Sequence, residues 1–220
     1  MNQELIHVYF MPGMAANPAI FEYIDLPQDQ FKLHWLEWIL PDKHEGIKAY
    51  AERMSHLVVH DNCVLIGVSF GGILVQEMSS FLNLHKLIII SSVKNRTELP
   101  RRMKVARKTR AYKLIPTQLI GNVDALAKFA FGKTVNKRIS LYKKYLSMNN
   151  KRYLDWAIRE LICWDQLHSP DDIIHIHGEK DAVFPLRHIN QCITVEGGTH
   201  IMIINKYKWF NENLPKLILG

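Results

Sequence analysis

Residues 66–72 read IGVSFGG and place Ser69 between Gly67 and Gly71. Because an apolar run precedes this segment and another follows it, the pattern predicts a buried strand, a tight turn and a helix. Such a turn requires glycine two positions to either side of the serine, since larger side chains would collide with the neighbouring backbone. Two interpretations stay open from this motif alone: an ordinary glycine-rich turn, or a nucleophilic serine that stands clear of a sheet.

The composition is typical of a single globular domain. The chain has 220 residues, of which 48% are hydrophobic and 22% charged, and this predicts a sizeable core. No apolar run reaches the roughly 20 residues of a membrane-spanning helix, so no transmembrane segment is expected. The first residues carry no basic leader and no usual cleavage region, which argues against a secretory signal. Widely spaced cysteines, odd in number, indicate free thiols and a cytoplasmic protein; they are Cys63, Cys163 and Cys192.

The formal net charge is +7, and much of the basic character lies in residues 94–113, KNRTELPRRMKVARKTRAYK. This basic cluster has three interpretations: a solvated helical face, a rim that attracts anions to a binding site, or a nucleic-acid surface. The chain contains no recognisable zinc-finger, RRM-like or KH-like pattern, so nucleic-acid binding is not expected.

Strand-like and helix-like segments alternate along much of the chain. This alternation predicts an α/β fold with a mostly parallel central sheet, flanked by helices and joined by right-handed crossovers. The expected strands are 5–10, 31–39, 63–67, 86–90, 172–177 and 192–195, and the expected helices are 45–59, 71–82 and 205–217.

Residues 94–169 break the alternation. Strand-like runs stop there, lysine and arginine increase, and helical spacing dominates. One apolar stripe has the i, i+3, i+4, i+7, i+8 spacing of an amphipathic helix; it comprises Leu154, Ala157, Ile158, Leu161 and Ile162. We therefore expect one domain, 1–220, that carries a helical insertion at 94–169 after the strand at 86–90.

Two further motifs follow predicted strands. The segment 174–181, IHIHGEKD, ends in Asp181, and the segment 197–202, GGTHIM, contains His200. Open α/β sheets place their binding sites at the carboxyl ends of their strands, where both side chains are expected. Each residue also has an ordinary interpretation, as a turn aspartate that caps a helix or as a loop histidine.

The chain order Ser69, Asp181, His200 matches the order of the catalytic triad in α/β-hydrolases. The sequence resembles this superfamily over 6–93 and about 172–209, leaving the insertion unmatched. The resemblance implies that Ser69 is a nucleophile, His200 its general base and acid, and Asp181 the carboxylate that orients His200. It further implies cleavage of a carboxylic ester or thioester through an acyl-enzyme, with no cofactor.

The resemblance also implies an oxyanion hole formed by the backbone N–H groups of Phe70 and Met14. The family's usual His-Gly-X segment reads Pro12-Gly13-Met14 here. The backbone N–H of Met14 is expected to remain available as a donor although Pro12 replaces the usual histidine. The path of the loop stays open, because proline fixes its own φ and restricts the residue before it.

Related enzymes carry a cap over the acyl pocket at the position of the insertion. By that analogy Trp156, Phe129 and Trp164 are expected to bind substrate, and the further aromatic candidates are Phe131, Tyr142 and Tyr145. Packing in the interior is the alternative for most of these side chains. The basic cluster leads to the hypothesis that the substrate, a small-molecule ester or thioester, carries an anionic group.

Three other acidic residues compete with Asp181 for the triad position, but none fits the GxxD turn as well; they are Glu98, Asp171 and Glu179.

Two pairs of histidines are candidate metal ligands. His56 and His60 have the spacing of an HExxH zinc motif, but Leu57 occupies the glutamate position and no third ligand is evident. His175 and His177 share one face of a strand, where packing is expected. No metal site is predicted.

Two other classes of function remain open. In the first alternative to a serine hydrolase, the chain is a slow or inactive protein of this fold that binds or senses a ligand. In the second, its basic cap docks an acidic partner. The oligomeric state is left open by the sequence.

Overall fold

The computed structural model describes residues 5–114 and 144–220. Six strands form one sheet in the order β2-β1-β3-β4-β5-β6, and every neighbouring pair is parallel. The strands are β1 (Ile6–Met11), β2 (Phe31–Trp35), β3 (Cys63–Val68), β4 (Leu84–Ile90), β5 (Ile174–Gly178) and β6 (Ile193–Val195). The α/β architecture predicted from the alternation is confirmed.

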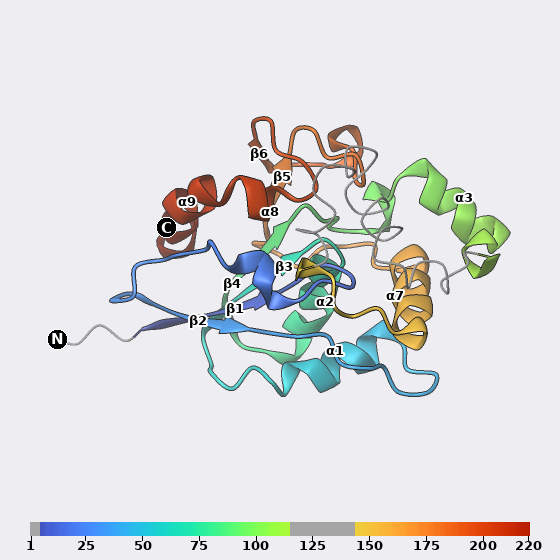
Figure 1. The fold of residues 1–220 in the computed structure, drawn as a ribbon, viewed down its shortest axis with the longest axis horizontal. Helices are drawn as coiled ribbons and strands as arrows, with labels where there is room; N and C mark the ends of the chain where they lie inside the picture. Colours follow the sequence, from blue (N-terminus) through green and yellow to red (C-terminus); the bar gives the residue numbers. More distant parts are fainter. Residues whose placement is uncertain (1–4, 115–143) are drawn as a thin grey trace.

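Helices cover both faces of this sheet. In Figure 1, α1 (Ile47–Ser55) and α2 (Phe70–Met78) lie on one side of the sheet, and α8 (Met202–Asn205) and α9 (Tyr207–Leu219) lie on the other. Between β4 and β5 the chain forms α3 (Arg101–Thr109) and α7 (Lys151–Cys163). Short 3₁₀ helices occur at η1 (Pro18–Phe21), η2 (Ser79–Phe81), η3 (Arg96–Glu98), η4 (Ala111–Leu114) and η6 (Leu186–His188).

Within the described parts of the predicted insertion 94–169, helices are the regular elements, and the apolar stripe of α7 is buried as expected. Residues 115–143 lie outside the described residues, so the predicted cap stays a prediction. The three cysteines are free, as predicted.

The predicted elements have the observed order but differ from the observed ones at their ends, most clearly the strand at 31–39 and the helix at 45–59, which is observed as α1. The strand expected at 31–39 ends at Trp35, because Trp38 turns inward and its indole N–H donates to the carbonyl of Gly13 at 2.8 Å. The closing helix divides at Lys206 into α8 and α9.

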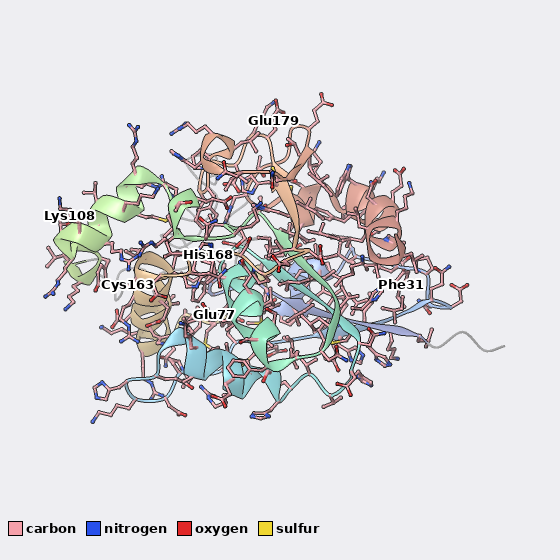
Figure 2. The ribbon with its side chains drawn as sticks, turned by 180° about the vertical axis from the view of Figure 1, so that it is seen from behind. Phe31, Glu77, Lys108, Cys163, His168 and Glu179 are labelled. Carbon is pink, nitrogen blue, oxygen red and sulfur yellow. The ribbon has the colours of Figure 1, made fainter. Side chains whose placement is uncertain are left out.

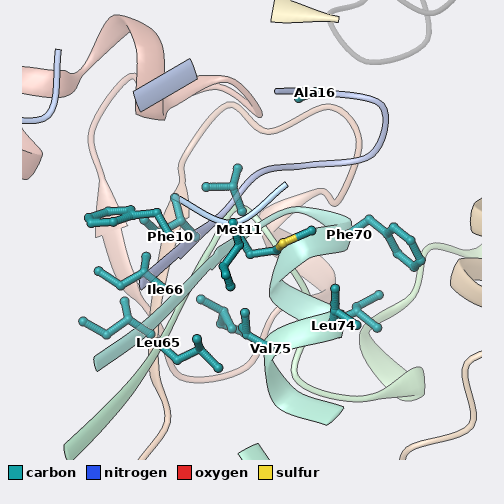
Figure 3. Close-up of a cluster of buried hydrophobic side chains, with 14 of the residues drawn as sticks. Phe10, Met11, Ala16, Leu65, Ile66, Phe70, Leu74 and Val75 are labelled. Atoms are coloured by element: carbon teal, nitrogen blue, oxygen red, sulfur yellow. The ribbon is translucent and has the colours of Figure 1, made fainter. Parts of the chain in front are cut away.

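The helix α2 packs against β3 and β1 in the core. All six residues of β3 are buried, as expected for a parallel strand covered on both faces. Figure 3 shows Phe10 and Met11 of β1 beside Leu65 and Ile66 of β3, with Leu74 and Val75 of α2 near them. This packing fixes the start of α2 relative to the end of β3.

The connection between β3 and α2 is a strained turn. Ser69 has φ 54° and ψ −120°, a conformation that L-residues rarely adopt. A Cβ on Gly67 would lie 2.4 Å from the carbonyl oxygen of Gly71, and a Cβ on Gly71 would lie 2.3 Å from that of Pro12. Both glycines are therefore required sterically, as the sequence predicted.

Two buried histidines lie on β5. The His177 Nε2–H donates to the carbonyl of Phe184 at 2.8 Å, so its Nδ1 accepts from the Nε2–H of His175 at 3.1 Å. Burial, followed by the proximity of His177, lowers the pKa of His175 to about 3. Burial also lowers the pKa of His177. The packing role predicted for this pair is confirmed.

Replacement of Gly71 by alanine is expected to destabilise the fold by about 1–3 kcal/mol, because the added methyl group overpacks the turn against backbone that cannot yield easily. Urea unfolding measures this loss. Gly46→Ala is the matched control, since a Cβ at Gly46 would meet nothing within 4 Å; its effect is expected to stay below about 1 kcal/mol, a helix-cap effect. Equal losses in the two variants would contradict the steric account.

Acidification is expected to destabilise the protein through His175. Its pKa falls from 6.5 to about 3 on folding, so between these values the unfolded chain binds more protons. The free energy of unfolding therefore decreases as pH falls, by about 2 kcal/mol from this group at pH 5. Urea unfolding at pH 7 and pH 5 tests this, with His175→Gln expected to lose less on acidification and His56→Gln to behave like wild type. A wild-type pH slope in His175→Gln would contradict it.

Candidate active site

Three sequence-predicted side chains meet at the carboxyl edge of the sheet. The Nε2 of His200 lies 2.9 Å from the Oγ of Ser69, and its Nδ1 lies 2.9 Å from Oδ2 of Asp181. Ser69 follows β3, Asp181 follows β5 and His200 follows β6. Since a carboxylate only accepts, Nδ1–H donates to Asp181 and the bare Nε2 accepts from the serine hydroxyl.

Asp181 is held as an anion inside the protein. Its Oδ1 accepts the N–H groups of Val183 and Phe184 at 2.8 and 2.9 Å. Burial opposes ionisation, but the nearby His200 and then His177 and the Phe184 N–H hold the pKa of the Asp181 carboxyl below its ordinary value. The electrostatic attraction of His200, together with hydrogen bonds to the charged form, thus outweighs desolvation.

His177, on β5, contacts both the Asp181 carboxylate and the segment that follows it. Its Nε2 lies 3.5 Å from Oδ2 of Asp181 while bonding the Phe184 carbonyl. Both ends of the segment 181–184 are therefore tied to one imidazole. The sequence alone predicts a packing role for His177. Its contact with Asp181 could not be predicted, because only the fold brings the segment 181–184 back over β5.

The predicted oxyanion donors line the same cavity as Ser69. Neither the Phe70 nor the Met14 N–H donates to an acceptor within the described ranges, and Phe70 begins α2, where the first N–H groups have no helical partner. The loop that carries Met14 is anchored at both sides, by the indole of Trp38 on the Gly13 carbonyl and by the Tyr153 hydroxyl, which accepts from Ala15 N–H at 3.2 Å. These two hydrogen bonds hold the loop in place on both sides of Met14, with proline at position 12.

An apolar cavity of about 80 Å³ opens beside Ser69 and His200. The ring of Phe184 packs against the imidazole of His200 with centroids 5.5 Å apart. Apolar side chains from several segments form the walls; they include Ile20, Tyr145, Leu146, Leu161, Val183, Phe184, Ile203 and Ile204. Most of these positions carry no sequence motif, since they converge from η1, α7, α8 and loops.

Trp156 and Trp164, expected to bind substrate, are not among the residues that line this cavity, and this corrects the prediction. The Trp156 indole packs on Tyr50 with centroids 4.4 Å apart and donates to the Glu45 carbonyl. The Trp164 indole donates to the Glu77 carboxylate at 2.7 Å. Both tryptophans pack in the interior instead.

Of the other aromatic candidates, Tyr145 lines the cavity. Phe129, Phe131 and Tyr142 lie outside the described residues.

The competing acids are engaged elsewhere. The buried Glu98 carboxylate accepts from the N–H groups of Lys94 and Asn190. Glu179 accepts from Gly197 N–H, and Asp171 is exposed. Within the described ranges, Asp181 is the carboxylate that contacts His200.

Part of the basic cluster supports the site structurally. The Arg102 guanidinium donates to the carbonyls of Ala182 and Val183, next to Asp181, and the Arg107 guanidinium donates to that of Trp164. Other members are exposed, and Figure 2 shows Lys108 on the outer part of α3. The predicted role of this cluster in attracting anions stays a prediction.

No protein-family model and no curated protein matches the sequence. Solved structures do match. An esterase from Thermogutta terrifontis is 15% identical over 96% of this chain and 90% of its own, with a TM-score of 0.65. A carboxylesterase structure from Nitrososphaera gargenis is 15% identical over 98% and 90%, with a TM-score of 0.70. A bromoperoxidase from Bacillus anthracis is 16% identical over 100% and 94%, with a TM-score of 0.68.

Within residues 5–114 and 144–220, every helix is too short or too polar to span a lipid bilayer. The structural matches extend over nearly the whole chain. The chain therefore has the fold of the α/β-hydrolase superfamily.

Proposed function

We propose that this protein is a serine hydrolase that cleaves a carboxylic ester or thioester through an acyl-enzyme. The observation that carries the proposal is the position of His200, which lies within 2.9 Å of both the Ser69 hydroxyl and the Asp181 carboxylate. A serine hydroxyl is a poor nucleophile unless a base takes its proton as the new bond forms. His200 is placed to be that base.

In the proposed first step, Ser69 Oγ attacks the carbonyl carbon of the substrate while Nε2 of His200 accepts the hydroxyl proton. The anionic Asp181 stabilises the imidazolium, which then protonates the leaving alcohol or thiol. A water molecule, deprotonated by the same imidazole, attacks the acyl-enzyme. Its attack releases the acid and restores Ser69.

The negative charge that develops on the substrate oxygen requires donors. Phe70 and Met14 line the cavity, and their N–H groups donate to no acceptor among the described residues, so these two groups are the proposed oxyanion hole. The start of α2 adds its positive end to this site. Each such donor contributes about 10²–10³ in rate in related chemistry.

The cavity favours a short, apolar acyl group. Its volume of about 80 Å³ corresponds to the space of roughly three water molecules at liquid density, and its walls are mainly aliphatic and aromatic. Oxygen esters are the first expectation, since the similar structures include an esterase and a carboxylesterase. The bromoperoxidase neighbour shows that this fold also occurs in proteins named for other reactions.

The alternatives are a ligand-binding protein without turnover and a cap that docks an acidic partner. Neither requires a histidine bonded simultaneously to a strained serine and a buried carboxylate. Turnover and covalent labelling separate these classes from a hydrolase.

A fluorophosphonate probe is expected to label Ser69 in the wild-type protein. Ser69→Ala is expected to abolish the labelling, and to lower kcat for a p-nitrophenyl ester by about 10⁴–10⁶-fold because the nucleophile is lost. His200→Ala is expected to slow the labelling strongly. Mass spectrometry of the labelled peptide and steady-state kinetics measure these effects. Ser80→Ala, at an exposed serine, is the matched control; labelling that persists in Ser69→Ala would refute the proposed nucleophile.

The small apolar cavity predicts selectivity for short acyl chains. In the series of p-nitrophenyl acetate, butyrate, octanoate and dodecanoate, kcat/KM is expected to be at least about tenfold higher for butyrate than for dodecanoate. Ile204→Phe narrows the cavity and is expected to penalise butyrate more than acetate. Leu217→Phe on α9, which does not line the cavity, is the control. Equal kcat/KM values along the series would contradict the assigned acyl pocket.

A further inference from the structure

Three histidines from separate segments meet on the sheet away from the proposed active site. His7 lies on β1, His34 lies on β2, and His60 lies between α1 and β3. One imidazole nitrogen from each lies within 4.8 Å of the other two. Nδ1 of His7 is 2.8 Å from Nε2 of His34, and the rings of His7 and His60 stack with centroids 3.4 Å apart.

Strand register explains why they meet. His34 is directly paired with Tyr9 across β1 and β2, and His7 precedes Tyr9 by two residues, so the three side chains share one face of the sheet. The Tyr9 ring stacks on His34 with centroids 4.4 Å apart. The Tyr9 hydroxyl lies 2.6 Å from Nδ1 of His60 and also accepts the Val59 N–H.

We propose that His7, His34 and His60 form a binding site for a divalent transition-metal ion of the zinc class. Imidazole nitrogen suits zinc, copper and nickel, whereas magnesium and calcium require oxygen ligands. Within the described ranges, the cluster contains no carboxylate or thiolate. Three histidines leave a fourth position for water, and the half-buried rings leave the site accessible to it.

The observed spacing is close to that of a metal site. Zinc–nitrogen bonds of about 2.0–2.1 Å in a tetrahedron place ligand nitrogens about 3.3 Å apart. The His7–His34 pair would separate by roughly 0.5 Å from its present 2.8 Å, and the widest pair would close by at most about 1.5 Å from 4.8 Å. Rotation of the imidazole rings about their side-chain bonds can change the nitrogen–nitrogen distances by these amounts while the strands stay in place.

Metal binding requires one change in the His7–His34 pair. In the His7–His34 hydrogen bond, one of the two nitrogens carries a proton. That ring must change tautomer when the metal binds, moving the proton to its other nitrogen, so that both facing nitrogens are bare.

Tyr9 orients one ligand from outside the coordination sphere. When Nε2 of His60 binds the metal, its Nδ1–H donates to the Tyr9 hydroxyl oxygen, 2.6 Å away. Metal-bound histidines commonly have such a partner on the second nitrogen, and its loss weakens metal binding by about 10–100-fold.

This histidine cluster is separate from the proposed triad. His60 precedes β3, whereas Ser69 follows it, so the two groups lie toward opposite ends of that strand. A metal held there would tie the edge strand β2 to β1 and to the segment that enters β3. The role assigned to the ion is therefore structural.

The test uses the full chain, stripped with a chelator and titrated with Zn²⁺ against a chromogenic chelator. The wild type is expected to bind one zinc ion per chain. His7→Gln and His34→Gln are each expected to weaken binding by at least about 100-fold, and Tyr9→Phe by about tenfold. His56→Gln, at an exposed histidine that ends α1, is the matched control and is expected to bind like wild type.

Wild-type affinity in both ligand variants, or loss of binding in His56→Gln, would overturn the proposal. X-ray absorption of the zinc-loaded wild type provides a readout that does not depend on whether a variant folds. About three imidazole nitrogens at about 2.0 Å are expected. Fewer than two, or no stoichiometric binding by the wild type, would overturn the assignment.

Discussion

The contact between Gly71 and the carbonyl of Pro12 is the constraint on which the site depends. Because Gly71 lacks a side chain, the loop after β1 approaches the first turn of α2 closely. This approach places Met14 in the wall of the cavity that contains Ser69 and Phe70. The strained φ of 54° at Ser69 is maintained by the dense packing of α2 on β1 and β3. The close contact between this loop and α2 therefore positions both the proposed nucleophile and the proposed oxyanion donors.

The buried carboxylate of Asp181 orients His200 toward Ser69. Asp181 is buried, and an isolated buried carboxylate would take up a proton. Here two N–H groups, His200 and the neutral His177 favour its ionised form instead. The anion then selects the His200 tautomer whose Nε2 faces Ser69. A small set of hydrogen bonds around one carboxylate thus defines the direction of proton transfer proposed for the reaction.

The two ends of the sheet differ in chemistry. At the carboxyl end, apolar walls surround the proposed nucleophile Ser69, which suits an uncharged carbonyl compound. Toward the other end of β3, the histidine cluster brings three imidazoles into a small volume, which suits the proposed metal ion. The parallel strands run between these two ends, so the two proposed sites share no side chains.

The sequence by itself determined the alternation of strands and helices, the glycine turn at Ser69 and the order of Ser69, Asp181 and His200, because these features depend on local periodicity and backbone sterics. Only the tertiary structure decided which apolar residues line the cavity. Trp156 and Trp164 have the right type but pack elsewhere, whereas Ile204 and Leu146 carry no motif. The histidine cluster is likewise invisible along the chain, because it depends on the register that places His34 opposite Tyr9. Spatial convergence of distant segments has no period in sequence, and the fold alone supplies it.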